Sequence, residues 1–129
     1  MMKFELYYKA LGNLLYAVAK ADGQVNSKEK LKVKSIVAEQ LLQLEDSLDD
    51  YGSDAAFATE FQFEECELNE LTSKEAFENF EEYFKTHKNV LKPHLKVFFY
   101  NLAKHVAQSS AGINKSESNI LAKIEAITK

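Results

Sequence analysis

The chain of 129 residues has the length of one domain, and its composition favours helices. It contains four Gly, one Pro and no Trp, and its apolar residues are mainly Leu, Ala and Phe, as in long helices. A single Cys excludes an internal disulfide bond, and no apolar run approaches the roughly 18 to 20 residues that a membrane-spanning helix needs. The first residues do not resemble a signal peptide. We therefore expect one all-α domain over residues 1–129, in the cytoplasm, without direct insertion into a membrane.

The acidic residues gather in the middle of the chain. The net charge is −4, but the window from Glu39 to Glu82 holds 15 of the 20 acidic residues and one basic residue, Lys74. All 16 basic residues are lysine, so the chain has no guanidinium group that could bind phosphate in a bidentate manner. We expect a protein partner with a basic surface rather than nucleic acid. A homodimer is also open.

Apolar residues at helical spacing predict two long helices in the first third of the chain. Phe4, Leu11 and Val18 belong to a repeat of three and four residues that predicts an amphipathic helix over residues 3–20. The same kind of pattern predicts a second helix over residues 27–48. We expect this helix to end before the turn-like sequence DDYGSD.

Four further helices complete a compact bundle of about six. A third helix is predicted over residues 54–67 by the apolar residues Phe57, Phe61 and Leu68. Thr72 and the glutamate three residues later have the spacing of a capping box, which starts a fourth helix, and Pro93 suits the first turn of a fifth. A sixth helix follows the sequence GIN. We expect the aromatic residues from Phe57 to Tyr100 to form core rather than to line a ligand groove, because they recur at helical spacing.

The first and the last helical pairs share a sequence pattern. Adding 88 to the positions from 13 to 36 gives seven identities in twenty-four ungapped positions, which is several times the chance level. The identities include Asn26 with Asn114 and Glu29 with Glu117. We therefore predict a duplicated helix-loop-helix hairpin made of the first two and the last two helices. Such hairpins commonly face each other about a pseudo-twofold axis, so we expect their two loops to lie close together.

The segment AKADGQVNSKE, between the first two helices, is the first candidate functional site. From Asp22 onwards it matches the second half of an EF-hand calcium loop, with Glu29 at the last ligand position. The first and third ligand positions would be Val18 and Lys20, whose side chains offer no oxygen, and this excludes an ordinary EF-hand. Calcium or another divalent cation held by Asp22, Glu29 and acids from elsewhere in the fold stays open as an alternative.

Helix capping explains most of the same residues. Asn26 can accept a hydrogen bond from the first free backbone amides of the second helix, and Glu29 can reach back to the amide of Asn26. Asn114 and Glu117 repeat this capping box in the second copy. Asp22 has no capping role, and we expect it to bind the amides of its own loop.

The sequence LLYAVAKADGQVNSKE resembles the N-terminal signature of the tellurite-resistance TerB-like domains, which are related to the N-terminal region of the DjlA co-chaperone. The resemblance covers most of the chain. It implies a compact helical bundle, bacterial and either cytoplasmic or tethered to the inner membrane face, with a link to stress and tellurite resistance. It implies no established enzymatic reaction, but it does suggest a metal or partner site at signature acids, which Asp22 and Glu29 match. Ser110 stands at the position that corresponds to Asp22 in the second copy, which weakens the case for a symmetric two-loop metal site.

No catalytic group of residues is evident in the sequence. His87, His94 and His105 are seven and eleven residues apart, so no two have the one-turn spacing of a helical zinc pair. Cys66 has no cysteine partner, and we expect a small buried residue. The leading hypothesis is a non-enzymatic interaction module that acts through its acidic surface in a stress or tellurite-resistance response. Divalent-cation sensing is the alternative.

Overall fold

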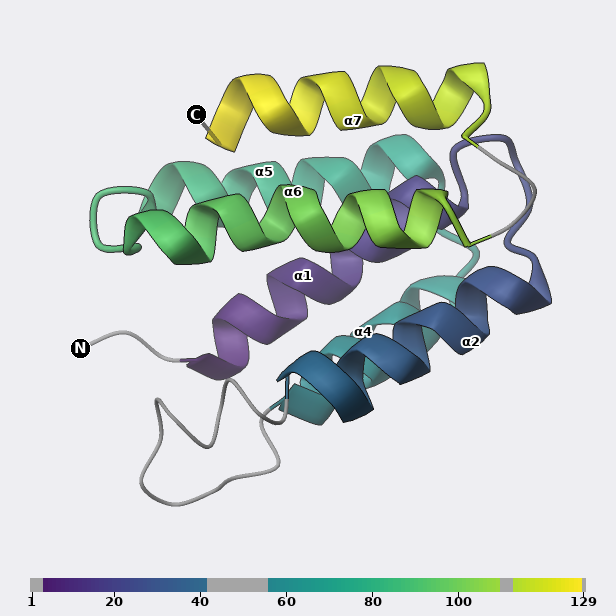
Figure 1. The fold of residues 1–129 in the computed structure, drawn as a ribbon, viewed down its shortest axis with the longest axis horizontal. Coiled ribbons are helices and arrows are strands. Elements are labelled where there is room, and N and C mark those ends of the chain that lie inside the picture. Colours follow the sequence, from purple (N-terminus) through teal and green to yellow (C-terminus); the bar gives the residue numbers. More distant parts are fainter. Residues whose placement is uncertain (1–3, 42–55, 110–112, 129) are drawn as a thin grey trace.

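The structure is a computed structural model that describes residues 4–41, 56–109 and 113–128. These residues form six α-helices and one short π-helical segment and contain no β-strand, so the all-α prediction is confirmed (Figure 1). In chain order the elements are α1 (Phe4–Ala19), α2 (Ser27–Ile36), the π-helical segment η1 (Val37–Leu41), α4 (Phe57–Leu68), α5 (Ser73–His87), α6 (Pro93–Ala107) and α7 (Lys115–Thr128).

Helix α1 runs through the middle of the bundle (Figure 1). It contacts α4, α5, α6 and α7. Every residue from Ala10 to Ala19 is buried, so the second half of the helix has no face in water. A helix that is apolar around its whole circumference is stable only when neighbours cover all of it. The position of α1 follows from this requirement.

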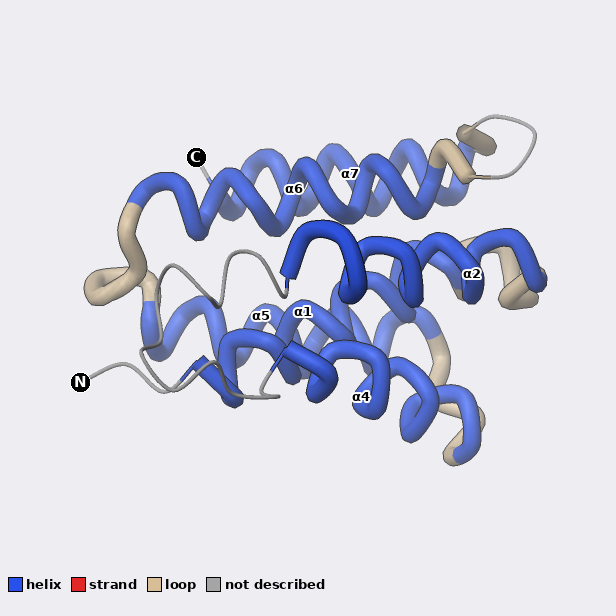
Figure 2. The backbone as a smooth tube through the Cα atoms, turned by 60° about the horizontal axis from the view of Figure 1, so that its bottom comes forward, coloured by secondary structure: helices blue, strands red, loops and turns tan. Residues whose placement is uncertain are grey.

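The remaining helices form two groups around α1. Helices α4 and α5 both pack on α1, whereas α7 packs chiefly on α6, and α6 also contacts α1 and α2. Figure 2 shows α6 and α7 along one side of the molecule, with α1, α4 and α5 on the other. The first and last helical pairs are therefore in direct contact, because α6 touches both helices of the first pair.

Buried hydroxyl groups connect α1 to its neighbours. The hydroxyl of Tyr7 donates to the carbonyl of Leu95 at 2.8 Å, and the hydroxyl of Thr59 donates to the carbonyl of Tyr8 at 2.8 Å. A buried donor without a partner would cost about 1–3 kcal/mol, so these pairs favour one alignment of the helices. They position α1 against α6 and α4.

Aromatic side chains fill the space between α1, α5 and α6, as predicted. The ring of Phe99 lies 4.7 Å from the ring of Tyr7 and 4.9 Å from the ring of Phe80, between ring centroids. The contact between Phe80 and Phe99 is edge to face, which is a favoured geometry for aromatic pairs. The other buried phenylalanines are Phe63, Phe77 and Phe84. Most of this aromatic set is therefore core.

The predicted helix starts at Thr72 and Pro93 are confirmed. The N–H of Glu75 donates to the Thr72 hydroxyl at 3.1 Å, and the N–H of Thr72 donates to the Glu75 carboxylate at 2.9 Å. Pro93 is the first residue of α6, where a missing N–H leaves no helical hydrogen bond unmade.

The second predicted helix, over residues 27–48, is described as far as Leu41. Its α-helical geometry ends at Ile36 and continues as the π-helical segment η1. The rest of that predicted helix and the DDYGSD turn lie outside the described residues.

Helix α4 forms where a helix is predicted, but it buries a different face. Phe61 and Leu68, which the apolar pattern assigns to the buried side, are 63% and 83% exposed. The buried residues are Thr59, Phe63 and Cys66. They also recur at helical spacing, but Thr and Cys give a weaker apolar signal than Phe and Leu, so the pattern selects the wrong stripe.

Gly12 allows α1 and α4 to approach each other closely. A Cβ at this position would lie 2.6 Å from the carbonyl oxygen of Thr59 and 2.8 Å from the Cβ of Gln62.

We expect Gly12→Ala to destabilise the fold by about 1–3 kcal/mol, because a clash with backbone outweighs the roughly 1 kcal/mol that alanine gains in helix propensity. Urea unfolding measures the change. Ser118→Ala, on the exposed face of α7, is the control and should cost little. A stabilised Gly12→Ala variant would contradict the close contact.

Candidate functional site

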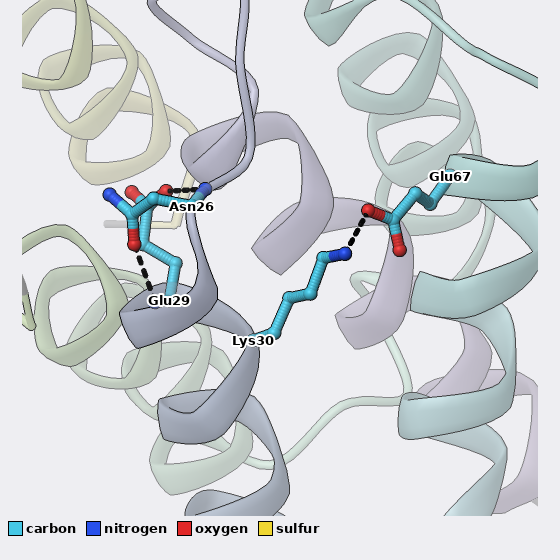
Figure 3. A network of polar contacts seen from close by, with 4 residues as sticks. All are labelled: Asn26, Glu29, Lys30 and Glu67. Atoms are coloured by element: carbon cyan, nitrogen blue, oxygen red, sulfur yellow. Dashed lines mark hydrogen bonds and ion pairs between the residues drawn. The ribbon is translucent and has the colours of Figure 1, made fainter.

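The loop between α1 and α2 ends in the predicted capping box. The N–H of Glu29 donates to Asn26 Oδ1 at 2.8 Å, and the N–H of Asn26 donates to Glu29 Oε1 at 3.1 Å (Figure 3). These amides lie at the start of a helix, where no preceding turn supplies carbonyl groups to accept them. Asn26 is therefore confirmed as the N-cap of α2.

The start of α7 repeats this arrangement. The N–H of Glu117 donates to Asn114 Oδ1 at 2.8 Å, and the N–H of Asn114 donates to Glu117 Oε1 at 3.1 Å. The predicted cap at Asn114 is confirmed. Glu29 and Glu117 are each only 2% exposed, although glutamate is rarely buried so completely. Both capping boxes thus lie partly inside the protein.

Asp22 joins the two loops. Its Oδ1 accepts a hydrogen bond from the N–H of Gln24 at 3.1 Å, which confirms the predicted bond to its own loop. Its Oδ2 accepts a second hydrogen bond from Asn114 Nδ2 at 3.3 Å, across 92 positions of the sequence. The expected closeness of the two loops is therefore confirmed. The role of Asp22 as their link was not predicted, because it depends on how the two hairpins pack.

The carboxyl group of Glu29 has an unusual electrostatic environment. Its pKa is raised from 4.5 to about 7, and the largest cause is burial, which outweighs the lowering effect of the hydrogen bond from the Asn26 backbone. A hydrogen bond with Glu117 and the negative charges of Glu117 and Asp22 contribute to the same rise. Near neutral pH the protonated form of Glu29 therefore persists and can donate to the Glu117 carboxylate. At the junction of the two capping boxes, Glu29 and Glu117 therefore lie in one environment, and the charge of Glu117 influences the protonation of Glu29.

Residues that are identical in the two copies of the repeat are buried to a similar degree at most positions. Pairs that are buried in both copies are Leu14 with Leu102, Val18 with Val106, Ala19 with Ala107, Glu29 with Glu117 and Ile36 with Ile124. Asn13, by contrast, is buried, whereas its counterpart Asn101 is exposed. The duplication of the hairpin stays a prediction.

The acids at the junction do not form an evident cation site. Among the described residues, no group of three or more His, Cys, Asp or Glu side chains could hold a metal ion. Both carboxylate oxygens of Asp22 already accept hydrogen bonds, and Oε1 of Glu29 accepts one from Asn26. The calcium hypothesis for Asp22 and Glu29 stays a prediction. Calorimetric titration of the protein with calcium and magnesium tests it, and the absence of any heat of binding would contradict it.

Cys66 is a buried core residue, as expected. Its thiol donates to Asn13 Oδ1 at 3.3 Å, and Nδ2 of Asn79 donates to the same oxygen at 3.2 Å. Burial raises the pKa of the thiol, which lowers the fraction of the reactive thiolate. No histidine is hydrogen-bonded to this thiol within the part of the chain that the structure describes. The surroundings of Cys66 therefore do not activate a nucleophile.

An acidic surface covers the outer sides of α4 and α5. Its exposed glutamates are Glu64, Glu65, Glu70, Glu75, Glu78 and Glu82. Between Glu39 and Glu82, the described acidic residues form one ion pair, in which Glu67 Oε2 lies 2.6 Å from Lys30 Nζ of α2 (Figure 3). The other negative charges of this surface have no cationic partner among the described residues. Part of the acidic window predicted from the sequence lies outside those residues.

None of the described helices is long and apolar enough to cross a membrane. Comparisons of the chain with models of protein families, with curated proteins and with solved structures found no match. The function of the chain must therefore be inferred from the geometry of the two capped loops and from the charge of the acidic surface.

The raised pKa of Glu29 predicts a pH dependence of stability. Between about pH 4.5 and pH 7, the folded state keeps a proton that the unfolded state has released. The contribution of Glu29 to stability is therefore fully present below about pH 4.5 and is lost as the pH rises through about 7. Glu29→Gln should remove this loss, because glutamine cannot ionise and still suits the capping box.

As the pH rises from about 5 to about 8, the free energy of unfolding of Glu29→Gln should increase relative to that of the parent by on the order of 2 kcal/mol. Urea unfolding at intervals across this range measures the difference. Glu75→Gln is a matched control, because Glu75 holds the same position in an exposed capping box. Its difference from the parent measures the effect of losing the carboxylate from an exposed capping box. Parallel pH curves for Glu29→Gln and the parent would contradict the raised pKa.

Single substitutions in the two loops separate capping from bridging. Asn26→Ala should cost about 1 kcal/mol of unfolding free energy, because the start of α2 loses its side-chain acceptor. Asp22→Ser should cost less than about 1 kcal/mol, since its two hydrogen bonds are exposed to water. Denaturant unfolding measures both, with Thr72→Ala as a control for loss of an exposed cap. A larger loss for Asp22→Ser than for Asn26→Ala would contradict this order.

Proposed function

We propose that the protein is a non-enzymatic interaction module, and that the acidic surface of α4 and α5 binds a partner protein with a basic surface. The observation that carries the proposal is the uncompensated charge of this surface. Its exposed glutamates extend from α4 through the following turn onto α5. In the sequence from Glu39 to Glu82, Lys74 is the only basic residue.

The fold does not need these charges. The glutamates of the surface point outward, while burial of apolar and aromatic residues holds α4 and α5 against α1. Like charges at neighbouring positions on one helix, such as Glu78 and Glu82, repel each other and destabilise a helix slightly. A feature that costs stability and does not support the core is better explained by binding.

An acidic surface of this kind acts mainly on association. A field of one sign steers a basic partner toward the surface and raises the association rate, and dissolved salt screens the effect. Binding should therefore weaken as the ionic strength rises. The absence of arginine in the chain agrees with a role as the acidic member of such a pair.

The resemblance of residues 14–29 to TerB-like domains supports the same proposal. It suggests a bacterial cytoplasmic setting and a role in a stress or tellurite-resistance response. It also agrees with a protein that binds other proteins rather than one that catalyses a reaction. We include this setting in the proposal.

Matched charge substitutions test the acidic surface. The immobilised protein is used to retain binding proteins from a cell lysate, and a retained protein is then purified for calorimetric titration. Glu78→Gln with Glu82→Gln should weaken its binding at least several-fold, because the surface loses two charges. Glu5→Gln with Glu125→Gln makes the same change of net charge on α1 and α7 and should leave binding nearly unchanged.

Salt provides the second measurement of the same titration. Binding by the parent should weaken between low and physiological ionic strength, and the Glu78 and Glu82 double variant should respond less to salt. If that double variant binds as tightly as the parent and with the same salt dependence, the proposed role of the acidic surface is wrong.

A further inference from the structure

A groove of about 430 Å³ lies between α2 and α4. Its lining includes the buried residues Val33 and Phe63 and the largely exposed Leu31, whose side chain is 65% exposed. The two helices make little direct contact with each other, and each packs instead on other parts of the bundle. The groove therefore has an apolar floor and two helical walls.

The two walls carry opposite charges. On the α2 wall stand Lys30 and Lys34, and on the α4 wall stand Glu60, Glu64 and Glu67. Lys30 reaches across to Glu67, with 2.6 Å between Nζ and Oε2 (Figure 3). Lys34, Glu60 and Glu64 form no ion pair with any described residue. One lysine and two glutamates thus face each other across the groove without direct partners.

Exposed apolar residues continue beside the acidic wall. Phe61 and Leu68 are seven residues apart on α4 and so lie on one side of this helix, next to the stripe that contains Glu64. Together with Leu31 they are among the most exposed large apolar side chains of the described residues. Apolar surface rimmed by charged residues is typical of a protein-binding site.

We propose that this groove binds an amphipathic helix of the partner protein, with an apolar stripe between one basic and one acidic flank. The apolar stripe covers Leu31 and the groove floor. The basic flank lies along Glu60 and Glu64, and the acidic flank lies along Lys34. This inference rests on the proposed function, because Glu64 of the α4 wall also belongs to the acidic surface, and it names the recognised element.

The geometry selects a helix as the occupant. A peptide strand binds by adding to the edge of a β-sheet, and the walls of this groove are helices whose backbone hydrogen bonds are already made. A helix laid between two helices offers side chains at intervals of three and four residues to the floor and charged side chains to both walls. Opposite charges on the two walls then fix the direction in which the helix lies.

The ion pair between Lys30 and Glu67 does not obstruct this binding. Both side chains are partly exposed, and an exposed ion pair contributes only about 0–1 kcal/mol to stability. A partner helix can therefore replace it with its own charges at little cost. The pair joins the two walls in the free protein and gives way when the groove is filled.

Synthetic peptides test the groove directly. The first probe is a helical peptide of about five turns, with leucines on one stripe, lysines on one flank and glutamates on the other. The second has the same composition, with the leucines rearranged so that no stripe forms. Fluorescence anisotropy should detect binding of the first peptide and at least about tenfold weaker binding of the second.

Three variants of the protein complete the test. Leu31→Ser and Glu64→Lys change exposed residues of the groove, and each should weaken binding of the first peptide by about tenfold. Glu125→Lys makes the same change of charge as Glu64→Lys on the exposed side of α7 and should change binding less than about twofold. Circular dichroism and urea unfolding verify that all three variants fold. Equal binding of both peptides, or of the parent and both groove variants, would overturn the inference.

Failure of this inference and failure of the proposed function give different results. If the purified partner loses affinity for the Glu78 and Glu82 double variant but not for Leu31→Ser or Glu64→Lys, the acidic surface binds outside the groove and the inference is wrong. If only the two groove variants lose affinity for it, the groove stands and the proposed role of the acidic surface on α5, at Glu78 and Glu82, is wrong. Sedimentation velocity detects a second copy as the occupant: self-association of the parent that Leu31→Ser abolishes would also overturn the inference.

Discussion

The burial of the second half of α1 is the constraint on which the rest of the structure depends. From Ala10 to Ala19 this helix has no side in water, so other helices must surround it, and Gly12 sets how closely α4 approaches. The faces of α4, α5 and α6 that cover α1 are the buried faces of these helices. The charged residues of these helices are then left outside, and the acidic middle of the sequence becomes a surface shared by α4 and α5.

The same packing brings the two capping boxes together, although each box needs only the residues at the start of its own helix. Each capping box satisfies the start of its own helix, and a carboxylate there also interacts favourably with the helix dipole. Packing of α6 against both α2 and α7 brings Glu29 and Glu117 into one buried environment, where two negative charges repel. A proton held by Glu29 relieves the repulsion. The two capping boxes together thus produce an electrostatic repulsion between Glu29 and Glu117 that neither box would have alone.

Local features of this protein could be predicted from its sequence, and features that depend on packing could not. The caps at Asn26 and Asn114 follow from residue types within one turn, and so do the starts of the helices. The buried face of α4 could not be read correctly, because Thr59 and Cys66 owe their burial to specific partners on α1. The close approach of Glu29 and Glu117 was not predicted either, since the repeat indicates that the two loops lie near each other but not which side chains are in contact.

The single thiol of the chain makes the contact between α1 and α4 observable without any substitution. Cys66 is fully buried and bonded to Asn13, so a reagent that alkylates thiols can reach it only when the two helices separate. The rate of alkylation under native conditions therefore reports how often that separation occurs, as hydrogen exchange does for backbone amides. If α4 moves when the protein binds its partner, the rate at which Cys66 is alkylated will differ between the free protein and the complex. A buried core residue then reports motion at the binding surface.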